Sequence, residues 1–327
     1  MEYRRFGKTG REVSVIGFGA WAIGSAWGTV SDADSLAALH AAADAGVTLI
    51  DTADVYGDGR SERLIGRFLR ERAGERFFVA TKMGRRAPVE MASYTPEAFR
   101  SWIDESRDNL GMDRLDLVQL HCLHPSIYYS PEHFAALDEL VDAGAIANYG
   151  VSVERVEEAL KAIEFPGVAT VQIIFNVVRQ RPADLLLAEA RRRDVGVLAR
   201  VPLASGLLTG KLNRSSTFEA SDHRSFNRHG EAFDVGETFS GVDFETGLAF
   251  VEDLRALVPQ DATMAQLALR WILMFEGVTA AIPGAKSPEQ ARANAAAADL
   301  APLPVATMAR IETLYNERIR PLVHQRW

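Results

Sequence analysis

Several features that mark secreted, membrane-bound or nucleic-acid-binding proteins are scarce in this sequence of 327 residues. Its single cysteine, Cys122, cannot form an intramolecular disulfide, and no cysteine and histidine cluster has zinc spacing, so we expect no metal site and a reducing, cytoplasmic compartment. No run reaches the roughly 18 apolar residues of a membrane span, and the first residues hold no apolar signal segment. The net charge of -8 argues against nucleic-acid or anionic-membrane partners, which need a basic surface.

What the sequence does contain is the composition of a globular protein, with 47% hydrophobic and 24% charged residues. A length of 327 residues is long for one ordinary domain, but barrels of alternating strands and helices reach this size as a single unit. There is no linker-like, repeated or low-complexity tract in the sequence. We therefore expect a single domain over residues 1–327.

Eight short apolar runs, each followed by a helix-like stretch, are the main signal of secondary structure. Their nearly continuous apolar character suits parallel strands that are buried on both faces. The predicted strands are residues 13–18, 47–50, 77–81, 115–120, 145–151, 169–175, 195–199 and 278–282. A strand followed by a helix, repeated eight times, predicts an α/β fold of the (β/α)8 TIM barrel type.

Helix starts can be recognised between these runs. Each offers a side-chain oxygen as an N-cap, and three of the four are followed by proline, which is well tolerated at the first helical position. The four capping residues are Ser31, Thr95, Ser130 and Ser287. The run Ser287-Pro-Glu-Gln290 also has the spacing of a capping box.

Three segments lie outside the eightfold repeat. Residues 3–15 carry Gly7-Lys-Thr-Gly10 between two β-like pieces, which predicts a β-hairpin before the barrel. Residues 206–246, after the seventh strand, are polar and without periodicity, which predicts a long loop of the kind that often forms a lid. Pro302-Leu-Pro304 opens an extra C-terminal helix, and a tail then ends in Trp327.

Four polar side chains stand at or just after the ends of successive predicted strands. Asp51, Lys82 and His121 follow the second, third and fourth strands, and Tyr56 lies in the loop after Asp51. Because barrel enzymes bind their substrates at the carboxyl ends of the strands, we expect these side chains to share one mouth. Singly, each has an ordinary structural explanation, such as a helix cap, a surface charge or a core residue. Jointly, they favour an enzyme.

The four residues form a coherent set for proton transfer. An ordinary tyrosine titrates near pH ~10, so Tyr56 needs a nearby cation to act as an acid at neutral pH, and Lys82 can supply it. A buried Lys82 needs a carboxylate in turn, which Asp51 provides. We expect Tyr56 to donate a proton to a carbonyl oxygen, or to accept one from an alcohol in reverse, while His121 hydrogen-bonds the same oxygen.

An ordered set of motifs extends this pattern over essentially the whole chain. The motifs are Gly17-Phe-Gly-Ala-Trp21, Ala45-Gly-Val-Thr-Leu-Ile-Asp-Thr-Ala-Asp-Val-Tyr-Gly57, Ser61-Glu-Arg-Leu-Ile-Gly66, Thr81-Lys82, Asp116-Leu-Val-Gln-Leu-His121, Pro202-Leu-Ala-Ser-Gly-Leu-Leu-Thr-Gly-Lys211 and Ile282-Pro-Gly-Ala-Lys-Ser287. The sequence resembles the aldo-keto reductases, NAD(P)H-dependent barrel enzymes with a catalytic Asp, Tyr, Lys and His. The resemblance implies hydride transfer to a small-molecule aldehyde or ketone, with the reverse oxidation of an alcohol.

The resemblance also implies a cofactor site. Ser152 and Gln172 match the residues that hold the nicotinamide carboxamide, and Lys286 lies beside a predicted helix N-terminus, which is favourable for the 2′-phosphate. NADP(H) is therefore favoured over NAD(H). The implied cofactor residues are Gly19, Trp21, Asp51, Ser152, Gln172, Arg200, Pro202, Leu203, Ser205, Gly206, Leu208, Lys211, Gly284, Lys286, Gln290 and Asn294.

Two positions depart from the pattern of the family. Many members have an aromatic residue where this chain has Arg200, so we expect a guanidinium near the nicotinamide, either stacked flat or turned toward a phosphate or a substrate carboxylate. Val153 stands where many members have a polar residue after the position of Ser152, which removes one expected contact to the carboxamide.

The substrate is expected to lie beside Tyr56 and His121. Trp21 and Trp27 are predicted to form an apolar wall with Tyr56 around the substrate carbonyl. The loop of residues 206–246 and the C-terminal tail are expected to close this pocket. Cys122 is interpreted as a buried small residue rather than a nucleophile, because no neighbouring cation is evident that would lower its pKa.

Other classes of protein were weighed against this prediction. A cofactor-sensing subunit, resembling the β-subunits of ion channels, would need an apolar docking surface. A Schiff-base lyase or isomerase would use Lys82 as its nucleophile, and borohydride would then trap substrate on that residue. A Rossmann site is excluded because Ala22 breaks the glycine spacing that begins at Gly17-Phe-Gly19.

Overall fold

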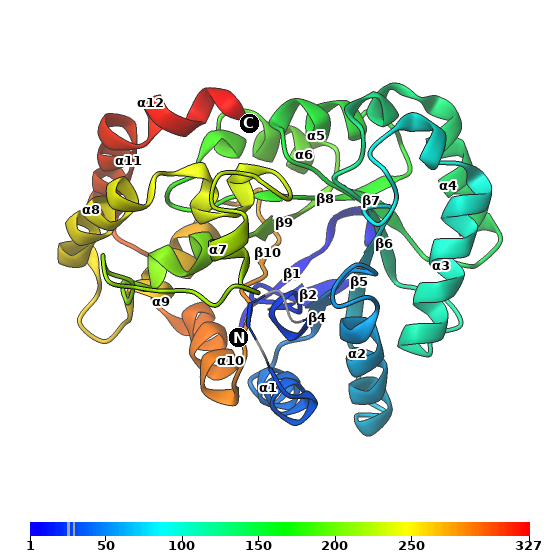
Figure 1. Cartoon of the computed structure of the whole chain (residues 1–327), viewed down its shortest axis with the longest axis horizontal. Helices are drawn as coiled ribbons and strands as arrows, with labels where there is room; N and C mark the ends of the chain where they lie inside the picture. The colour runs from blue at the N-terminus through cyan, green and yellow to red at the C-terminus, as the bar shows by residue number, and fades with distance from the viewer. Residues whose placement is uncertain (25–26, 29) are drawn as a thin grey trace.

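The structure is a computed structural model that describes residues 1–24, 27–28 and 30–327. In this part of the chain, eight parallel strands follow one another in chain order around the centre of the molecule (Figure 1). They are β3 (Phe18–Gly19), β4 (Leu49–Asp51), β5 (Phe78–Met83), β6 (Leu117–His121), β7 (Tyr149–Ser152), β8 (Val168–Ile174), β9 (Gly196–Arg200) and β10 (Ala280–Ala281). The predicted (β/α)8 TIM barrel is therefore confirmed.

The first and last strands close the sheet into a barrel. Ile16 pairs in parallel with Ala281, and Gly19 pairs in parallel with Gly284. A Cβ atom at Gly19 would lie only 2.6 Å from the carbonyl oxygen of Ile282. Glycine is therefore required for the two ends of the sheet to approach this closely.

The strand predicted at residues 13–18 is wrong in its boundaries. Its first part belongs to β2 (Glu12–Ser14), which pairs antiparallel with β1 (Tyr3–Arg5) and forms the predicted N-terminal hairpin. The barrel strand β3 begins only at Phe18. Val13 of the hairpin and Phe18 of the barrel strand are both buried and apolar, and apolar character alone does not show where the chain passes from the hairpin to the barrel.

The hairpin closes the amino-terminal end of the barrel. Phe6 is fully buried, and its ring centroid lies 5.4 Å from that of Phe78 at the start of β5. A Cβ atom at Gly196, the first residue of β9, would meet the Phe6 ring at 2.3 Å. Lys8 donates from Nζ to the carbonyl of Val168, the first residue of β8, at 3.0 Å. This seal leaves the carboxyl-terminal end of the barrel as the open end.

Helices surround the strands on all sides in Figure 1. The predicted N-caps Ser31, Thr95 and Ser287 accept hydrogen bonds from backbone N–H groups of their helices. Ser130 does not cap its helix, because its hydroxyl bonds the ring of His133 instead. The barrel helices are α1 (Asp32–Asp44), α2 (Arg60–Glu71), α3 (Pro96–Leu110), α4 (Pro131–Asp142), α5 (Val156–Ala162), α6 (Leu186–Arg192), α8 (Phe244–Leu254), α9 (Met264–Leu273) and α10 (Pro288–Ala295). Among the described residues, none of the helices has the length and apolar character needed to cross a bilayer.

The predicted loop of residues 206–246 is built from short helical turns. They are η6 (Ala204–Thr209), α7 (His223–Phe226), η7 (Val235–Glu237) and η8 (Phe239–Gly241). The extra C-terminal helix is present as α11 (Val305–Arg318), and α12 (Arg320–Val323) follows it. Trp327, at the end of the tail, donates from its indole nitrogen to Asp234 at 2.9 Å and lies under the guanidinium of Arg179, 3.6 Å from its ring centre. The tail therefore packs against the segment that contains η7 and η8.

Candidate active site

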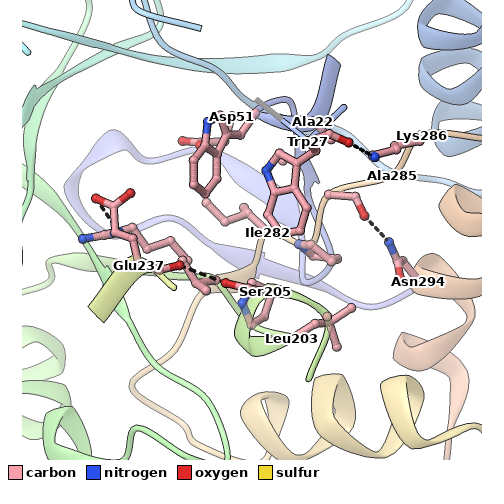
Figure 2. A pocket seen from close by; sticks show the side chains of 18 of the residues that line it. Ala22, Trp27, Asp51, Leu203, Ser205, Glu237, Ile282, Ala285, Lys286 and Asn294 are labelled. Carbon is pink, nitrogen blue, oxygen red and sulfur yellow. Dashed lines mark hydrogen bonds and ion pairs between the residues drawn. The ribbon is translucent and has the colours of Figure 1, made fainter. Parts of the chain in front are cut away.

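A cavity of about 600 Å³ opens at the carboxyl-terminal end of the barrel. In Figure 2, Glu237 lies on one side of it and Lys286 and Asn294 lie on the other. The residues expected from the sequence that line this cavity are Gly19, Trp21, Trp27, Asp51, Tyr56, His121, Gln172, Arg200, Pro202, Leu203, Ser205, Gly206, Lys211, Gly284, Lys286, Gln290 and Asn294. The barrel thus gathers into one cavity residues that are far apart in the sequence.

Lys82 is the centre of a hydrogen-bonded group at the edge of the cavity. Its Nζ donates to Asp51 Oδ1 at 2.6 Å, to the carbonyl of Thr52 at 2.7 Å and to the hydroxyl of Tyr56 at 3.3 Å. The other carboxylate oxygen of Asp51 accepts a hydrogen bond from Gln172 Nε2 at 2.7 Å. The ammonium group therefore uses all three of its protons, and the pairing with a carboxylate offsets the cost of burying it.

The electrostatics of the group keep a proton on Tyr56. Burial alone would lower the pKa of Lys82, but the carboxylate of Asp51 and the hydroxyl of Tyr56 outweigh it and raise that pKa. Burial raises the pKa of Tyr56, and Lys82 opposes this rise. Tyr56 is therefore protonated at neutral pH, with a cation 3.3 Å away that can stabilise the phenolate once the proton leaves.

His121 lies next to Tyr56, as the strand pattern predicts. The two ring centroids are 6.0 Å apart, and the rings are close to perpendicular. Burial, followed by the positive charges of Arg85, Lys82 and Arg200, lowers the pKa of His121 well below its usual range. Its Nε2 lies 3.4 Å from Arg85 Nη1, whereas its Nδ1 has no hydrogen-bond partner among the described residues. The imidazole is therefore neutral in this site.

Aromatic side chains form the predicted wall of the cavity. The Trp21 ring stacks on that of Tyr56 with centroids 6.2 Å apart, and it meets Trp27 edge-on at 5.4 Å. Phe233, from the loop of residues 206–246, extends the wall at 6.1 Å from Trp21. The expectation that the C-terminal tail closes the pocket is wrong, because Trp327 packs outside the cavity lining.

Cationic side chains also line the cavity. Lys211, Arg224 and Lys286 all line it. Arg224 is held by two hydrogen bonds to the carboxylate of Asp222, at 2.9 and 2.6 Å, and Nζ of Lys286 bonds the carbonyl of Trp27 (Figure 2). Burial lowers the pKa of Lys286, since it removes water from the ammonium. Arg224 lies in the aperiodic loop and was not expected from the sequence.

The segment beside Lys286 differs in detail from the predicted capping box. Ser287 does cap α10 through a bond from the N–H of Gln290, but the Gln290 side chain returns to the N–H of Lys286, at 2.8 Å, rather than to that of Ser287. Asn294, one turn further on, donates to the carbonyl of Gly284 at 3.1 Å. These bonds fix the polar side chains that face the cavity.

Three expected site residues do not line the cavity. Ser152 is fully buried, with its hydroxyl 3.9 Å from the Cys122 sulfur, and Leu208 is fully buried in the core. Lys82 is also buried and reaches the cavity only through the hydroxyl of Tyr56. The predicted contacts of Ser152 and Leu208 with a cofactor stay predictions.

Arg200 is engaged by carboxylates in the structure. Its Nη2 donates to Glu154 at 2.8 Å, and its Nη1 lies 3.5 Å from Glu237. Burial raises the pKa of Glu154 to about 7, although Arg200 opposes the rise. Burial acts in the same direction on Glu237, but Arg85 and Arg200 outweigh it and lower its pKa to about 2. Glu237 is therefore the more acidic of the two glutamates.

Of the charged wall formed by Arg85, Glu154, Arg200 and Glu237, the sequence predicted only Arg200. Arg85 donates from Nη1 to Glu237 at 2.8 Å, and both side chains line the cavity. Arg85 follows Lys82 by three residues at the end of β5, so the rule that strand ends face the mouth could have found it. Glu237 lies in the aperiodic loop, where no pattern distinguishes it from its polar neighbours.

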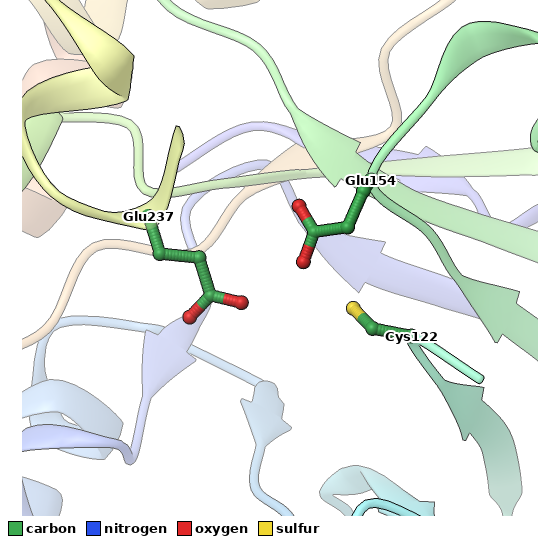
Figure 3. Close-up of side chains that lie close together, drawn as sticks. All are labelled: Cys122, Glu154 and Glu237. Carbon is green, nitrogen blue, oxygen red and sulfur yellow. The ribbon is translucent and has the colours of Figure 1, made fainter. Parts of the chain in front are cut away.

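Cys122, Glu154 and Glu237 point toward one another in Figure 3. The sulfur and one carboxylate oxygen of each glutamate lie within 4.8 Å of one another. Arg200 Nη2 contacts the Cys122 sulfur at 3.7 Å and Glu154 at 2.8 Å, and Arg85 bonds Glu237, so guanidinium groups supply the positive charge here. Burial raises the pKa of the Cys122 thiol, which fits its interpretation as a residue that is not a nucleophile.

Comparison with known proteins agrees with this geometry. The model of the Aldo/keto reductase family matches residues 15–316. The aldo-keto reductase YhdN of Bacillus subtilis is 32% identical over 310 residues, which cover 90% of this chain and 87% of the relative. A probable voltage-gated potassium channel subunit beta of Arabidopsis thaliana is 28% identical over 320 residues, 93% of each protein. An aldo-keto reductase from Klebsiella pneumoniae, solved in complex with NADPH, has a TM-score of 0.70 at 26% identity and covers 96% of this chain and 95% of that chain.

Proposed function

Because the chain belongs to the aldo/keto reductase family, we propose that it transfers hydride from NADPH to the carbonyl of an aldehyde or ketone and oxidises the alcohol in reverse. The observation that carries the proposal is the position of Lys82 between Asp51 and Tyr56, with His121 beside the Tyr56 ring. A protonated phenol next to a buried cation, in a cavity wall, is suited to protonating the oxygen that gains charge during reduction.

The lining of the cavity fits a nicotinamide dinucleotide. A phosphorylated dinucleotide carries several negative charges, and Lys211, Arg224 and Lys286 supply cations to the lining of the cavity. Gly206 and Gly284 expose backbone to the cavity, and a Cβ atom at Gly284 would have its nearest neighbours at 3.5 and 3.7 Å, so the open space there admits a ligand close to the backbone. The relative solved with NADPH supports the choice of NADP(H). When bound, NADPH supplies the hydride.

The residues of the chain would then divide the remaining work. Tyr56 gives the proton of its hydroxyl to the substrate oxygen, and Lys82 stabilises the phenolate that is left. Asp51 holds Lys82 in place, because its carboxylate accepts a hydrogen bond from the ammonium group of Lys82. The same carboxylate accepts a second hydrogen bond from Gln172 Nε2, which fixes Asp51 in turn. The neutral ring of His121 fixes the orientation of the carbonyl by a hydrogen bond to its oxygen.

The aromatic wall completes the site. Trp21, Trp27 and Phe233 present apolar rings beside the phenol of Tyr56. Such a wall excludes water from the reacting carbonyl and strengthens the electrostatic effect of Lys82. It also gives an apolar substituent of the substrate a surface on which to pack.

The structure argues against the alternative in which Lys82 forms a Schiff base. The side chain of Lys82 is 1% exposed, and its Nζ has three hydrogen-bond acceptors. A nucleophilic amine would have to lose its proton and these partners, which Asp51 disfavours. The group is better suited to tuning Tyr56.

The test is to mix the protein with NADPH or NADH, add a panel of aldehydes and ketones, and follow the loss of nicotinamide absorbance. We expect turnover with NADPH, weaker turnover with NADH, and a loss of activity in Tyr56→Phe. Tight cofactor binding without turnover of any carbonyl would instead favour a sensor subunit of the channel type. Turnover that Tyr56→Phe leaves intact would refute the proposed mechanism.

A further inference from the structure

Arg85 occupies a position that the proton-transfer chemistry does not explain. Its Nη1 lies 3.4 Å from His121 Nε2 and donates to Glu237 at 2.8 Å. His121 is the residue expected to bond the substrate oxygen, and both side chains line the cavity. A guanidinium at this place lies beside the position proposed for the substrate carbonyl.

The guanidinium of Arg85 has N–H groups that bond no other described residue. Within the described part of the chain, its hydrogen bonds and ion pairs all involve Nη1, which leaves Nε and Nη2 without partners. The group is also held in place, because Glu237 anchors one edge and the ring of Phe233 lies 5.3 Å from its centre. A fixed guanidinium with open N–H groups is suited to binding a carboxylate through two parallel hydrogen bonds.

The charges around Arg85 are balanced when Glu154 is ionised and net positive when Glu154 is protonated. Arg85 and Arg200 carry two positive charges, against which Glu237 is the carboxylate held in its charged form by both of them. Burial raises the pKa of Glu154 to about 7, so the wall carries a net positive charge when that group is protonated. Behind this wall, Asp234 raises the pKa of Glu154, and Glu154 and Asp234 both act against the lowering of the Arg179 pKa by burial. His121 is neutral.

We propose that Arg85 binds a carboxylate attached to the carbonyl carbon of the substrate, and that the preferred substrates are therefore 2-oxo acids. This inference rests on the proposed reductase function. In the reaction, the carbon to oxygen π bond breaks as hydride from NADPH forms a C–H bond at the carbonyl carbon, and Tyr56 supplies the proton for the new O–H bond. NADPH is oxidised to NADP⁺ and the 2-oxo acid is reduced to a 2-hydroxy acid, while its carboxylate stays on Arg85. The aromatic wall of Trp21 and Trp27 would receive the apolar side chain of the acid.

The test compares benzoylformate with its methyl ester, two aromatic ketones that differ in the charge of the neighbouring group. We expect the protein to have the higher kcat/KM for the acid, and Arg85→Gln to lower the ratio of acid to ester by about 10-fold or more, mainly through KM for the acid. Arg85→Lys keeps the charge without the planar fork and should give an intermediate ratio.

A neighbouring arginine provides the matched control. Arg86 bonds Glu105 at 2.6 Å and does not line the cavity, so Arg86→Gln makes the same change of charge one residue away. The ratio should be unaffected by this substitution. A ratio that Arg85→Gln leaves unchanged, or a wild-type preference for the ester or for neutral D-glyceraldehyde over the acid, would overturn the inference while leaving carbonyl reduction intact.

Calorimetry separates the inference from the function on which it rests. Benzoylformate is titrated into the protein in the presence of NADP⁺, and we expect binding that is weakened about 10-fold or more in Arg85→Gln and retained in Arg86→Gln. Arg85-dependent binding without turnover of any carbonyl would refute the reductase function and retain the carboxylate site. Carbonyl turnover without Arg85-dependent binding of benzoylformate would refute the carboxylate site and retain the reductase function.

Discussion

The two ends of the substrate region of this cavity differ in how the chain builds them. The reaction end is made by Asp51, Tyr56 and Lys82, which stand on or next to neighbouring barrel strands and are locked together by bonds of 2.6 and 3.3 Å. The charged wall next to it depends on Arg85, which follows β5, and on Glu237, which lies in a long loop. The proposed proton-transfer group thus stands on or next to barrel strands, whereas Glu237 belongs to a loop that can change without disturbing the barrel.

The largest effect is expected at the reaction end, from Lys82→Met. Methionine keeps the length of the side chain but removes the cation beside Tyr56, so we expect kcat to fall by about 10²–10⁴-fold. Steady-state reduction of an aromatic aldehyde by NADPH measures this. Lys161→Met is a matched control, because Lys161 pairs with Glu164 on the surface. If kcat of Lys82→Met fell by less than a few-fold, the proton-transfer group would not depend on this cation, and the difference between the two ends would be contradicted.

A substitution in the charged wall should change KM for an acidic substrate rather than kcat. Glu237→Gln retains an oxygen that can accept from Arg85 but removes the negative charge that competes with a substrate carboxylate. We expect KM for benzoylformate to fall several-fold, with a smaller change for its methyl ester. Kinetics with this pair of substrates make the measurement. A rise in KM for the acid would mean that Glu237 orients Arg85 more than it competes with the substrate.

The C-terminal residue offers a smaller perturbation of the same wall. Trp327 bonds Asp234 at 2.9 Å, and a Cβ atom at Gly241 would lie 2.4 Å from its ring, so it supports the turns on either side of Glu237. Trp327→Ala should raise KM for benzoylformate a few-fold, with a smaller effect on kcat, and should speed proteolysis within residues 226–241. Leu322→Ala, at an exposed position of α12, is the control. If Trp327→Ala and Leu322→Ala changed KM and proteolysis equally, Trp327 would not be the residue that supports the turns around Glu237.

The smallest effect concerns stability near the reaction end. Asp54 is 2% exposed, its carboxylate oxygens have no partner among the described residues, and burial raises its pKa to about 7. A raised pKa means that the folded protein holds this proton more tightly than the unfolded chain. Stability is therefore lost as the pH rises from about 4 through 7. Asp54→Asn should raise the Tm at pH 8 by roughly 3 °C or more and change it little at pH 4.

A neighbouring aspartate controls for the change of charge in this last experiment. The side chain of Asp58 is 93% exposed, so Asp58→Asn should leave the pH dependence of the Tm as it is. Thermal unfolding of the three proteins between pH 4 and pH 8 gives the comparison. A Tm difference for Asp54→Asn that does not grow with pH would contradict the assignment of a buried, raised pKa.

Most of the fold and the reaction end could be predicted from the sequence, because both follow from strand periodicity. Asp51, Lys82 and His121 end apolar runs, and parallel strands in a closed barrel must bring such residues together. The boundary of the first strand could not be found in this way, since the hairpin residue Val13 and the barrel residue Phe18 lie in one apolar stretch.

The charged wall was harder to predict from the sequence than the reaction end, for a physical reason. Its ion pairs join residues that lie far apart in the chain, such as Arg85 with Glu237 and Arg200, the last residue of β9, with Glu154; the separations are 152 and 46 positions. No local pattern links such partners, because their contacts depend on the tertiary path of each loop. For the same reason, Arg200 was expected either to stack flat near the nicotinamide or to turn toward a phosphate or a substrate carboxylate, and its carboxylate partners within the protein were not foreseen.

The central claim is that Tyr56 donates the proton and that its position on the barrel makes this possible. The most direct measurement is the single-turnover rate of carbonyl reduction by Tyr56→Phe that is preloaded with NADPH, together with its Kd for NADPH. We predict a rate at least about 10³-fold below that of the wild type, with a Kd within a few-fold of the wild-type value. A rate within about tenfold of the wild type, at full cofactor occupancy, would contradict the account.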